Sequence, residues 1–420
     1  MKKDIRKELK TRVLVMDGAM GSLIQEYKLT QADYHGERLK DFPNDQKGNN
    51  DILSITQGNI ISEIHTKYLK AGADILLTNT FNATSISQAD YGTEEFVYEM
   101  NKASAEIARK VADEFTNKNP AKPRFVVGSL GPTNKTLSLS PDVNDPGYRA
   151  VTFDEVKTSY REQVEGLLDG GVDLLLIETI FDTLNGKAAI FAIEEALEAR
   201  NLKLPLMVSG TITDASGRTL SGQTLEAFLN SVSHVDLLSI GLNCSLGASD
   251  LRPYIKELSK KAPFHISAHP NAGLPNQFGE YDETPEIMAG HIKDYLDNNF
   301  VNIIGGCCGT TPAHIHEFVK IAEKSNPHLI KVADNNTRFS GLEPVTMTEN
   351  TNFVNIGERC NVAGSRKFAR LIREEKYEEA LSIARAQVED GAQVIDVNLD
   401  DAMLDAEKEM VRFLNMLMAE

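Results

Sequence analysis

The sequence predicts an α/β protein: a (β/α)8 TIM barrel followed by an incomplete second α/β barrel. Short apolar runs alternate along the chain with segments of helical periodicity. A glycine stands before several of these runs, as in KAGAD (70–74), DGGVD (169–173) and EDGAQ (389–393). Glycine just past a helix end adopts the left-handed conformation that stops the helix. A continuous apolar run of about five residues fits a strand that is buried on both faces of a parallel sheet.

Eight apolar runs precede residue 310, at 13–16, 75–79, 125–129, 174–178, 206–210, 237–243, 264–269 and 301–305. Between them, helical periodicity is clear over residues 153–168, 190–199 and 224–232. Strands that alternate with helices in this number match a closed parallel barrel. The stretch 21–59 is polar and rich in Asn and Asp, so we expect it to be an insertion after the first strand.

The predicted barrel spans residues 1–325 and ends with a helix over 312–324. Residues 326–352 carry scattered Pro, Asn and Thr and are predicted to be a linker. The pattern then restarts, with strands at 353–356 and 393–398 and helices near 377–390 and 405–417. Two strands and two helices cannot close a barrel. We therefore expect residues 353–420 to be the first part of a truncated domain, and the chain to be a fragment.

Composition excludes several classes of protein. The 44 basic and 61 acidic residues give a net charge of −17, which disfavours binding to nucleic acid or to anionic membranes. No apolar run approaches the ~20 residues that span a bilayer, and the charged N-terminus does not fit a signal peptide. Four cysteines in 420 residues do not form a disulfide framework. These observations predict a cytoplasmic protein that binds neither nucleic acid nor membranes.

Three of the cysteines lie at predicted strand ends. Cys244 ends the sixth strand, and Cys307 and Cys308 end the eighth, within GGCCG (305–309). Active sites of parallel barrels lie at the carboxyl ends of the strands. Three thiolates that converge there would bind zinc and leave a fourth position open. Burial as small apolar residues is the alternative, but a vicinal pair in a glycine loop favours the metal site; Cys360 lies apart and is expected to be simply buried.

Two carboxylates also stand at predicted strand ends. Asp17 opens the turn DGAMG (17–21), whose backbone N–H groups can point at a carboxylate while Asp17 accepts from an ammonium group. Glu178 closes the fourth strand, where a carboxylate needs water or a positively charged partner. An ordinary turn and a rim salt bridge remain the alternatives at this point. The polar triplets TNT (78–80) and HPN (269–271) end two further strands.

Together, these motifs resemble a known family. DGAMG (17–21), TNTF (78–81), GLNCS (241–245) and GGCCG (305–309) resemble the homocysteine-binding barrel of homocysteine S-methyltransferases, from about residue 10 to 325. FVNIGERCN (353–361), GSRK (364–367) and DVN (396–398) resemble the start of a pterin-binding barrel. This combination and order are similar to those of cobalamin-dependent methionine synthases.

The resemblance implies that Cys244, Cys307 and Cys308 hold zinc and, through it, activate the sulfur of homocysteine. It further implies two sets of binding residues. The substrate-binding set is Asp17, Gly18, Ala19, Glu178 and Asn243, and part of a folate site is formed by Glu358, Asn361, Ser365, Arg366, Lys367 and Asn398.

In this family the methyl donor is methylcobalamin, recharged from 5-methyltetrahydrofolate. The cobalamin-binding module carries an Asp-x-His-x-x-Gly motif, and none of the nine histidines fits that spacing, so we expect that module to be a partner outside this chain.

The expected function is therefore zinc-dependent transfer of a methyl group to homocysteine, giving methionine. One alternative is a homocysteine methyltransferase that uses betaine or S-methylmethionine. The pterin-like motifs after residue 352 argue against it, because such enzymes need no folate barrel. A second alternative is a non-catalytic barrel whose Cys307–Cys308 pair serves as a redox or metal-storage site.

Overall fold

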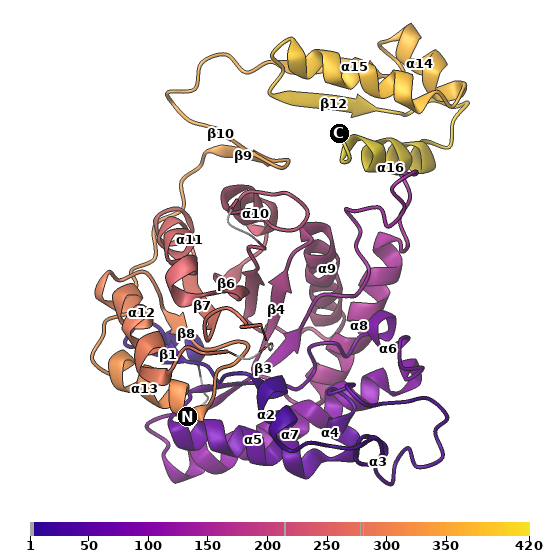
Figure 1. The fold of residues 1–420 in the computed structure, drawn as a ribbon. Helices are drawn as coiled ribbons and strands as arrows, with labels where there is room; N and C mark the ends of the chain where they lie inside the picture. Colours follow the sequence, from indigo (N-terminus) through magenta and orange to yellow (C-terminus); the bar gives the residue numbers. More distant parts are fainter. Residues whose placement is uncertain (1–3, 214–215, 278, 280) are drawn as a thin grey trace. The chain divides into compact units, whose positions relative to one another are not determined.

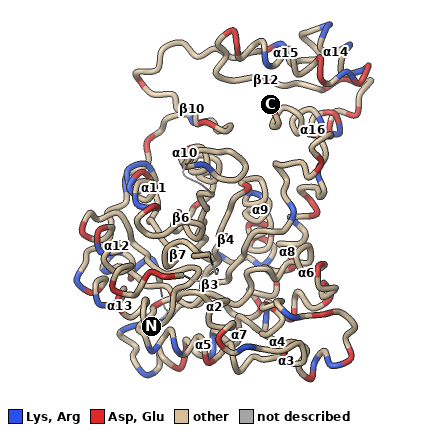
Figure 2. The backbone as a smooth tube through the Cα atoms, in the orientation of Figure 1, with Lys and Arg blue, Asp and Glu red and all other residues tan. Residues whose placement is uncertain are grey.

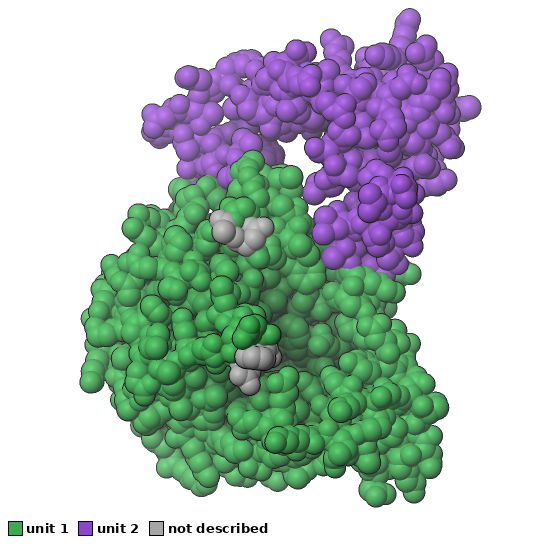
Figure 3. Space-filling view, in the orientation of Figure 1, with its two compact units in different colours: residues 1–135, 153–334, 341–343 green, residues 136–152, 335–340, 344–420 purple. Residues whose placement is uncertain are grey.

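The structure is a computed structural model that describes residues 4–213, 216–277, 279 and 281–420. The chain forms two compact units (Figure 3). Unit 1 comprises residues 1–135, 153–334 and 341–343, and unit 2 comprises residues 136–152, 335–340 and 344–420.

Unit 1 contains a parallel eight-stranded sheet in the order β1-β8-β7-β6-β5-β4-β3-β2 (Figure 1). A parallel bridge between Met16 and Ile75 connects the two edge strands, so the sheet closes into a barrel. The predicted TIM barrel is confirmed. Its strands are β1 (Leu14–Val15), β2 (Ile75–Leu77), β3 (Phe125–Leu130), β4 (Leu174–Ile180), β5 (Leu206–Gly210), β6 (Leu237–Gly247), β7 (His265–Asn271) and β8 (Ile303–Ile304).

The larger helices of unit 1 surround the strands (Figure 1). Gly72 shows why they end where they do: its φ of 107° ends the first of these helices, and its N–H donates to the carbonyl of Leu69 at 3.1 Å. These helices are α5 (Gly58–Ala71), α7 (Val97–Lys118), α8 (Phe153–Asp169), α9 (Thr183–Ala199), α10 (Leu225–Val232), α11 (Ala248–Lys261), α12 (Pro285–Asp297) and α13 (Pro312–Ala322).

The polar stretch after β1 is not an open loop. It holds α2 (Met20–Glu26), α3 (Gln31–His35) and α4 (Leu53–Thr56), and other short helices are α1 (Ile5–Glu8), α6 (Ser85–Gln88) and the 3-10 helix η1 (Glu94–Phe96). Buried amides hold this region together: Asn49 Nδ2 donates to Gln88 Oε1 at 2.8 Å. Its polar composition therefore reflects side-chain hydrogen bonding as well as solvent exposure.

The barrel interior changes from apolar to polar along the strands. Leu174 and Leu176 on β4 belong to the apolar core, and Glu178 follows on the same face. On β3 the same alternation runs from Phe125 and Val127 to Ser129. Charged residues lie mostly on the outer helices and loops (Figure 2). Among the described residues, no helix is both long and apolar enough to cross a membrane.

Unit 2 has its own sheets and core. Strands β11 (Ile356–Asn361) and β12 (Val394–Asn398) pair in parallel, and β9 (Thr337–Ser340) pairs antiparallel with β10 (Pro344–Met347). The helices are α14 (Arg366–Arg373), α15 (Tyr377–Glu389) and α16 (Ala406–Leu417). Phe368 and Phe413 pack edge to face in the core, with ring centroids 5.2 Å apart.

Two expectations for this region need correction. The strand predicted at residues 353–356 begins only at Ile356, where pairing with Val394 starts, and Phe353 is 84% exposed. The rest of this strand, GERCN (357–361), is polar and alternates only weakly, so its sequence does not predict a strand. The predicted linker also contains the β9–β10 hairpin, whose strands are short and largely exposed.

Candidate active site

The three rim cysteines converge at the carboxyl ends of β6 and β8. Their sulfur atoms all lie within 4.8 Å of one another, and Cys244 Sγ is 3.9 Å from Cys308 Sγ. The backbone that presents them is unusual: Cys244 has a φ of 60° and Gly309 a φ of 79°. The cysteine loop is also hydrogen-bonded to β7 and the residue that follows it, because Cys307 N–H donates to Pro270 O and Cys308 O accepts from Ala272 N, both at 2.9 Å.

The three thiol groups differ in their pKa. Hydrogen bonds from Cys244 and Cys307 lower the pKa of Cys308 to about 3, and the Tyr281 hydroxyl adds a further bond. Hydrogen bonds with Cys244 and Cys308, together with burial, raise the pKa of Cys307. The cluster by itself therefore favours a single thiolate. A bound cation would let all three ionise, so the donor set fits a metal with thiolate ligands.

Two carboxyl groups are buried at the same rim. Asp17 is 3% exposed; its Oδ2 accepts from Leu77 N at 3.0 Å, whereas Oδ1 has no hydrogen-bond partner. Burial raises the pKa of Asp17, and the nearby Glu178 raises it further. Burial also raises the pKa of Glu178 to about 7, although Ser129 donates a hydrogen bond to it. Two desolvated carboxyl groups near one another suit a positively charged ligand group such as an ammonium.

Asn243, predicted to bind substrate, is fully buried and bonded to its neighbours. Its Oδ1 accepts from Thr179 N at 2.9 Å and from Ser209 Oγ at 2.6 Å. Its Nδ2 donates to Thr179 Oγ1 at 2.7 Å and lies 3.5 Å from Glu178 Oε2. The amide therefore connects β4, β5 and β6. This arrangement lets Asn243 orient the carboxylate of Glu178.

The backbone of Gly18 and Ala19 lies against the cysteine loop. Ala19 N–H donates to Thr310 Oγ1 at 3.1 Å, and Gly306 N–H donates to Asp17 O at 3.2 Å. The sequence does not predict this role of Thr310. Thr310 directly follows GGCCG, which was the available signal, but its partner Ala19 stands 291 residues earlier.

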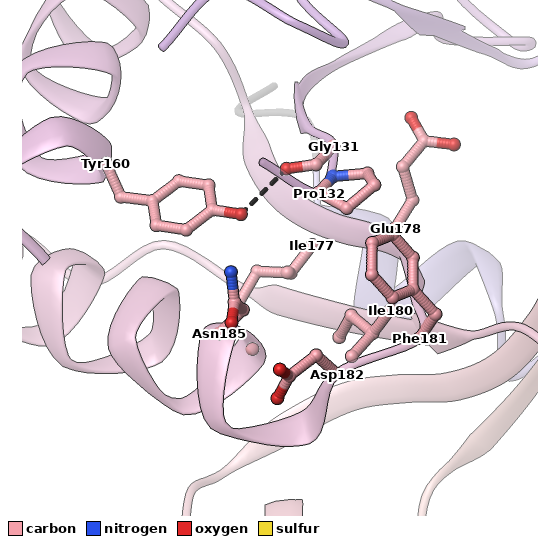
Figure 4. Close-up of a pocket in the computed structure, with 10 residues that line it drawn as sticks. Gly131, Pro132, Tyr160, Ile177, Glu178, Ile180, Phe181, Asp182 and Asn185 are labelled. Atoms are coloured by element: carbon pink, nitrogen blue, oxygen red, sulfur yellow. Dashed lines mark hydrogen bonds between the residues drawn. The ribbon is translucent and has the colours of Figure 1, made fainter. Parts of the chain in front are cut away.

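A small cavity lies beside Glu178 at the end of β4 (Figure 4). It measures about 10 Å³ and is lined by Gly131, Tyr160 and Asn185 among others. Tyr160 donates to Gly131 O at 2.9 Å, and in the figure the Glu178 carboxylate points away from Tyr160. A cavity of this size holds at most a water molecule. It is therefore not where an amino acid would bind.

In unit 2, the predicted folate residues gather only in part. Asn361 and Asn398 are register partners at the ends of β11 and β12, and Ser365 caps α14 by accepting from Phe368 N at 3.3 Å. Arg366 and Lys367 are exposed in the first turn of α14. Glu358 lies exposed earlier in β11, three residues before the strand end.

Comparison with known proteins agrees with this geometry. Residues 14–322 match the model of the family Homocysteine S-methyltransferase, and residues 357–420 match that of the family Pterin binding enzyme. The metallated form of the homocysteine methyltransferase MmuM from Escherichia coli is 25% identical, with a TM-score of 0.57 over 75% of this chain and 97% of that chain. Its oxidized form is 24% identical, with a TM-score of 0.56 over 73% and 95% of the two chains. The segment after the barrel resembles part of a pterin-binding enzyme, and the chain belongs to the homocysteine S-methyltransferase family and is a methyltransferase.

Proposed function

We propose that this chain performs the homocysteine half-reaction of a cobalamin-dependent methionine synthase. In that reaction a methyl group passes from methylcobalamin to the sulfur of homocysteine and gives methionine. The observation that carries the proposal is the convergence of Cys244, Cys307 and Cys308 within 4.8 Å at the rim of a homocysteine S-methyltransferase barrel.

The three thiolates would hold one zinc ion. Zinc bound in this way lowers the pKa of an added thiol, so that homocysteine is held as its thiolate near neutral pH. Three anionic sulfur donors are electron-rich, which keeps the substrate sulfur nucleophilic. The Tyr281 hydroxyl, hydrogen-bonded to Cys308, helps to fix one of these donors in place.

The buried carboxyl groups would hold the amino-acid end of homocysteine. Asp17 presents an unpartnered Oδ1, and Asn243 and Ser129 orient the carboxylate of Glu178. An ammonium group between them would offset the cost of ionising both carboxylates away from water. The backbone of Gly18 and Ala19 lies next to Asp17 and would line the same subsite.

The pterin-binding match favours the cobalamin-dependent type over enzymes that use betaine or S-methylmethionine. We propose a homocysteine barrel over residues 1–325, a connecting segment over 326–352 and part of a pterin-binding barrel over 353–420. The second part would contribute to a 5-methyltetrahydrofolate site. Its proposed residues are Glu358, Asn361, Ser365, Arg366, Lys367 and Asn398. A cobalamin-binding module would act as partner, in the cytoplasm.

Metal analysis tests the proposal directly. We expect about one zinc ion per chain, and release of about one proton when homocysteine binds near neutral pH. Cys308→Ser should lose the metal. Cys360→Ser is the matched control, since Cys360 is buried in unit 2 and accepts a hydrogen bond from Gln387 at 3.4 Å. A metal-free protein that still binds homocysteine with wild-type affinity would contradict the proposal.

A donor assay then separates the two enzymatic alternatives. The zinc-loaded chain is incubated with homocysteine and either free methylcobalamin, betaine or S-methylmethionine, and methionine is measured. We expect product with methylcobalamin. Product with betaine or S-methylmethionine alone would assign the chain to the other type of homocysteine methyltransferase.

A further inference from the structure

One buried hydroxyl group connects the two loops on which homocysteine would be held. Thr310 is 0% exposed, and its Oγ1 donates to Cys307 O at 2.7 Å and accepts from Ala19 N at 3.1 Å. The first bond fixes the loop that carries two of the three thiols. The second fixes the loop that begins with Asp17. Thr310 therefore spans from the sulfur end of the site to the amino-acid end.

The residues around the Thr310 hydroxyl are closely packed. A Cβ atom on Gly18 or Gly306 would lie 2.6 or 2.3 Å from Thr310 Oγ1, so both glycines are needed for the close approach. The Tyr68 hydroxyl, on α5, donates to Ala19 O at 3.0 Å and lies 3.2 Å from Thr310 O. Tyr68 is itself fully buried. The hydroxyl groups of Thr310 and Tyr68 thus both connect the two loops and hold them at one fixed separation.

A fixed separation has a chemical consequence for the choice of substrate. Homocysteine has two methylene groups between its α-carbon and its sulfur, and cysteine has one. A site whose two ends cannot approach each other can engage both ends of the longer thiol, but only one end of the shorter thiol. One methylene is worth about 10–200-fold in discrimination between substrates.

We propose that Thr310 is a positioning residue that sets this separation and thereby determines the preference for homocysteine over cysteine. The inference rests on the proposed function, because it assumes that homocysteine binds with its sulfur at the cysteine cluster. Without the Thr310 hydroxyl, Ala19 N–H loses its partner, and Cys307 O keeps only the backbone N–H of Thr310, at 3.1 Å. The two loops can then shift, and cysteine is no longer strongly excluded.

The test measures thiol binding and not turnover. The full chain is loaded with Co²⁺, whose sulfur-to-metal charge-transfer absorption reports binding of an added thiol, and Kd is measured for L-homocysteine and L-cysteine. In Thr310→Val, which keeps the shape but removes the hydroxyl, we expect the ratio of the cysteine Kd to the homocysteine Kd to fall by about tenfold. Thr310→Ser, which keeps the hydroxyl, should restore the wild-type ratio.

Thr93→Val is the matched control: Thr93 is also fully buried, but its hydroxyl donates to Gln88 Oε1 at 2.7 Å. An unchanged ratio in Thr310→Val, or equal weakening of both thiols, overturns the proposal. If Thr310→Val does not take up cobalt, the same measurement is made on Tyr68→Phe. A lower ratio of the cysteine Kd to the homocysteine Kd supports the proposal, and the wild-type ratio overturns it. Failure of the wild-type chain to bind Co²⁺ or homocysteine would instead overturn the proposed function.

Discussion

Individual polar residues at this rim are held by partners from distant parts of the sequence. Glu178 receives a hydrogen bond from Ser129 on β3 and faces Asn243 on β6. Both partners stand at nearby strand ends in the barrel, although 49 and 65 residues separate them from Glu178 along the chain. The site is thus preorganised before any ligand arrives, and its carboxyl groups are kept in a desolvated state that costs stability.

Replacing Glu178 should therefore raise the stability of the fold and weaken the binding of homocysteine. Because burial raises the pKa of Glu178 to about 7 from its usual 4.5, its contribution to stability is lost as pH rises through 7. Glu178→Gln removes this ionisation. At pH 8 the variant should be more stable to denaturant than the wild type by roughly 1–3 kcal/mol. Its Kd for homocysteine should rise about 10–100-fold, since a charged hydrogen bond to the ammonium group is lost.

Denaturant titrations at pH 5 and pH 8, with isothermal titration of homocysteine, measure both effects. The stability gain should vanish at pH 5, where Glu178 is protonated in the wild type. Glu162→Gln is a suitable control, because Glu162 lies on α8 and burial raises its pKa as well. Unchanged homocysteine affinity in Glu178→Gln would remove Glu178 from the proposed substrate subsite.

At the scale of secondary-structure elements, the turn after β8 is tightly constrained. Gly309 has a φ of 79°, and a Cβ atom there would lie 2.3 Å from Tyr281 Cβ. Gly309→Ala should cost roughly 1–3 kcal/mol in the free energy of unfolding, from backbone strain and from displacement of Tyr281. The shifted loop should also bind zinc more weakly, which a competition titration with a chelator measures.

A second glycine, Gly290, provides the control for Gly309→Ala. Gly290 lies inside α12, and a Cβ atom added there would have no neighbouring atom within 4 Å. Gly290→Ala should stabilise the protein by roughly 0.5–1 kcal/mol through helix propensity, without any change in zinc affinity. If Gly309→Ala matched Gly290→Ala in both measurements, the turn would not be constraining the metal loop.

Some parts of the fold and of the site can be predicted from the sequence, and others cannot. The eight barrel strands were predictable because each is an apolar run, several of them preceded by a helix-stopping glycine. Cys244, Cys307 and Cys308 were predictable as neighbours because strand ends of a parallel barrel share one rim. Thr310 and Tyr68 were not, since their hydrogen bonds depend on distances across the barrel that no local pattern encodes. The late start of β11 was missed because a polar strand lacks the periodicity by which strands are recognised.

At the scale of the whole molecule, each of the two units is built from several separate segments of the chain. Residues 341–343 belong to unit 1, where Gly341 O accepts from Gln223 Nε2 at 2.8 Å and Leu342 O accepts from Thr224 N at 3.0 Å. Residues 136–152 belong to unit 2, where Arg149 Nη2 donates to Asn415 O at 3.1 Å. A barrel fragment that keeps the contacts of residues 341–343 should therefore extend to residue 343, past the proposed boundary at residue 325.

We expect the fragment 1–343 to fold and to bind zinc and homocysteine, because the apolar barrel core lies entirely within it. It should exceed the fragment 1–340 in unfolding free energy by about 1–2 kcal/mol, the worth of the two hydrogen bonds that Gly341 and Leu342 accept. Residues 136–152 lose Asn415 as a partner in both fragments, so limited proteolysis should cut there faster than in the full chain. Equal stability of the two fragments would show that residues 341–343 do not complete the barrel. An unfolded 1–343 fragment would show that the barrel does not fold without residues beyond 343. Protection of residues 136–152 in the fragments would place that segment with the barrel instead.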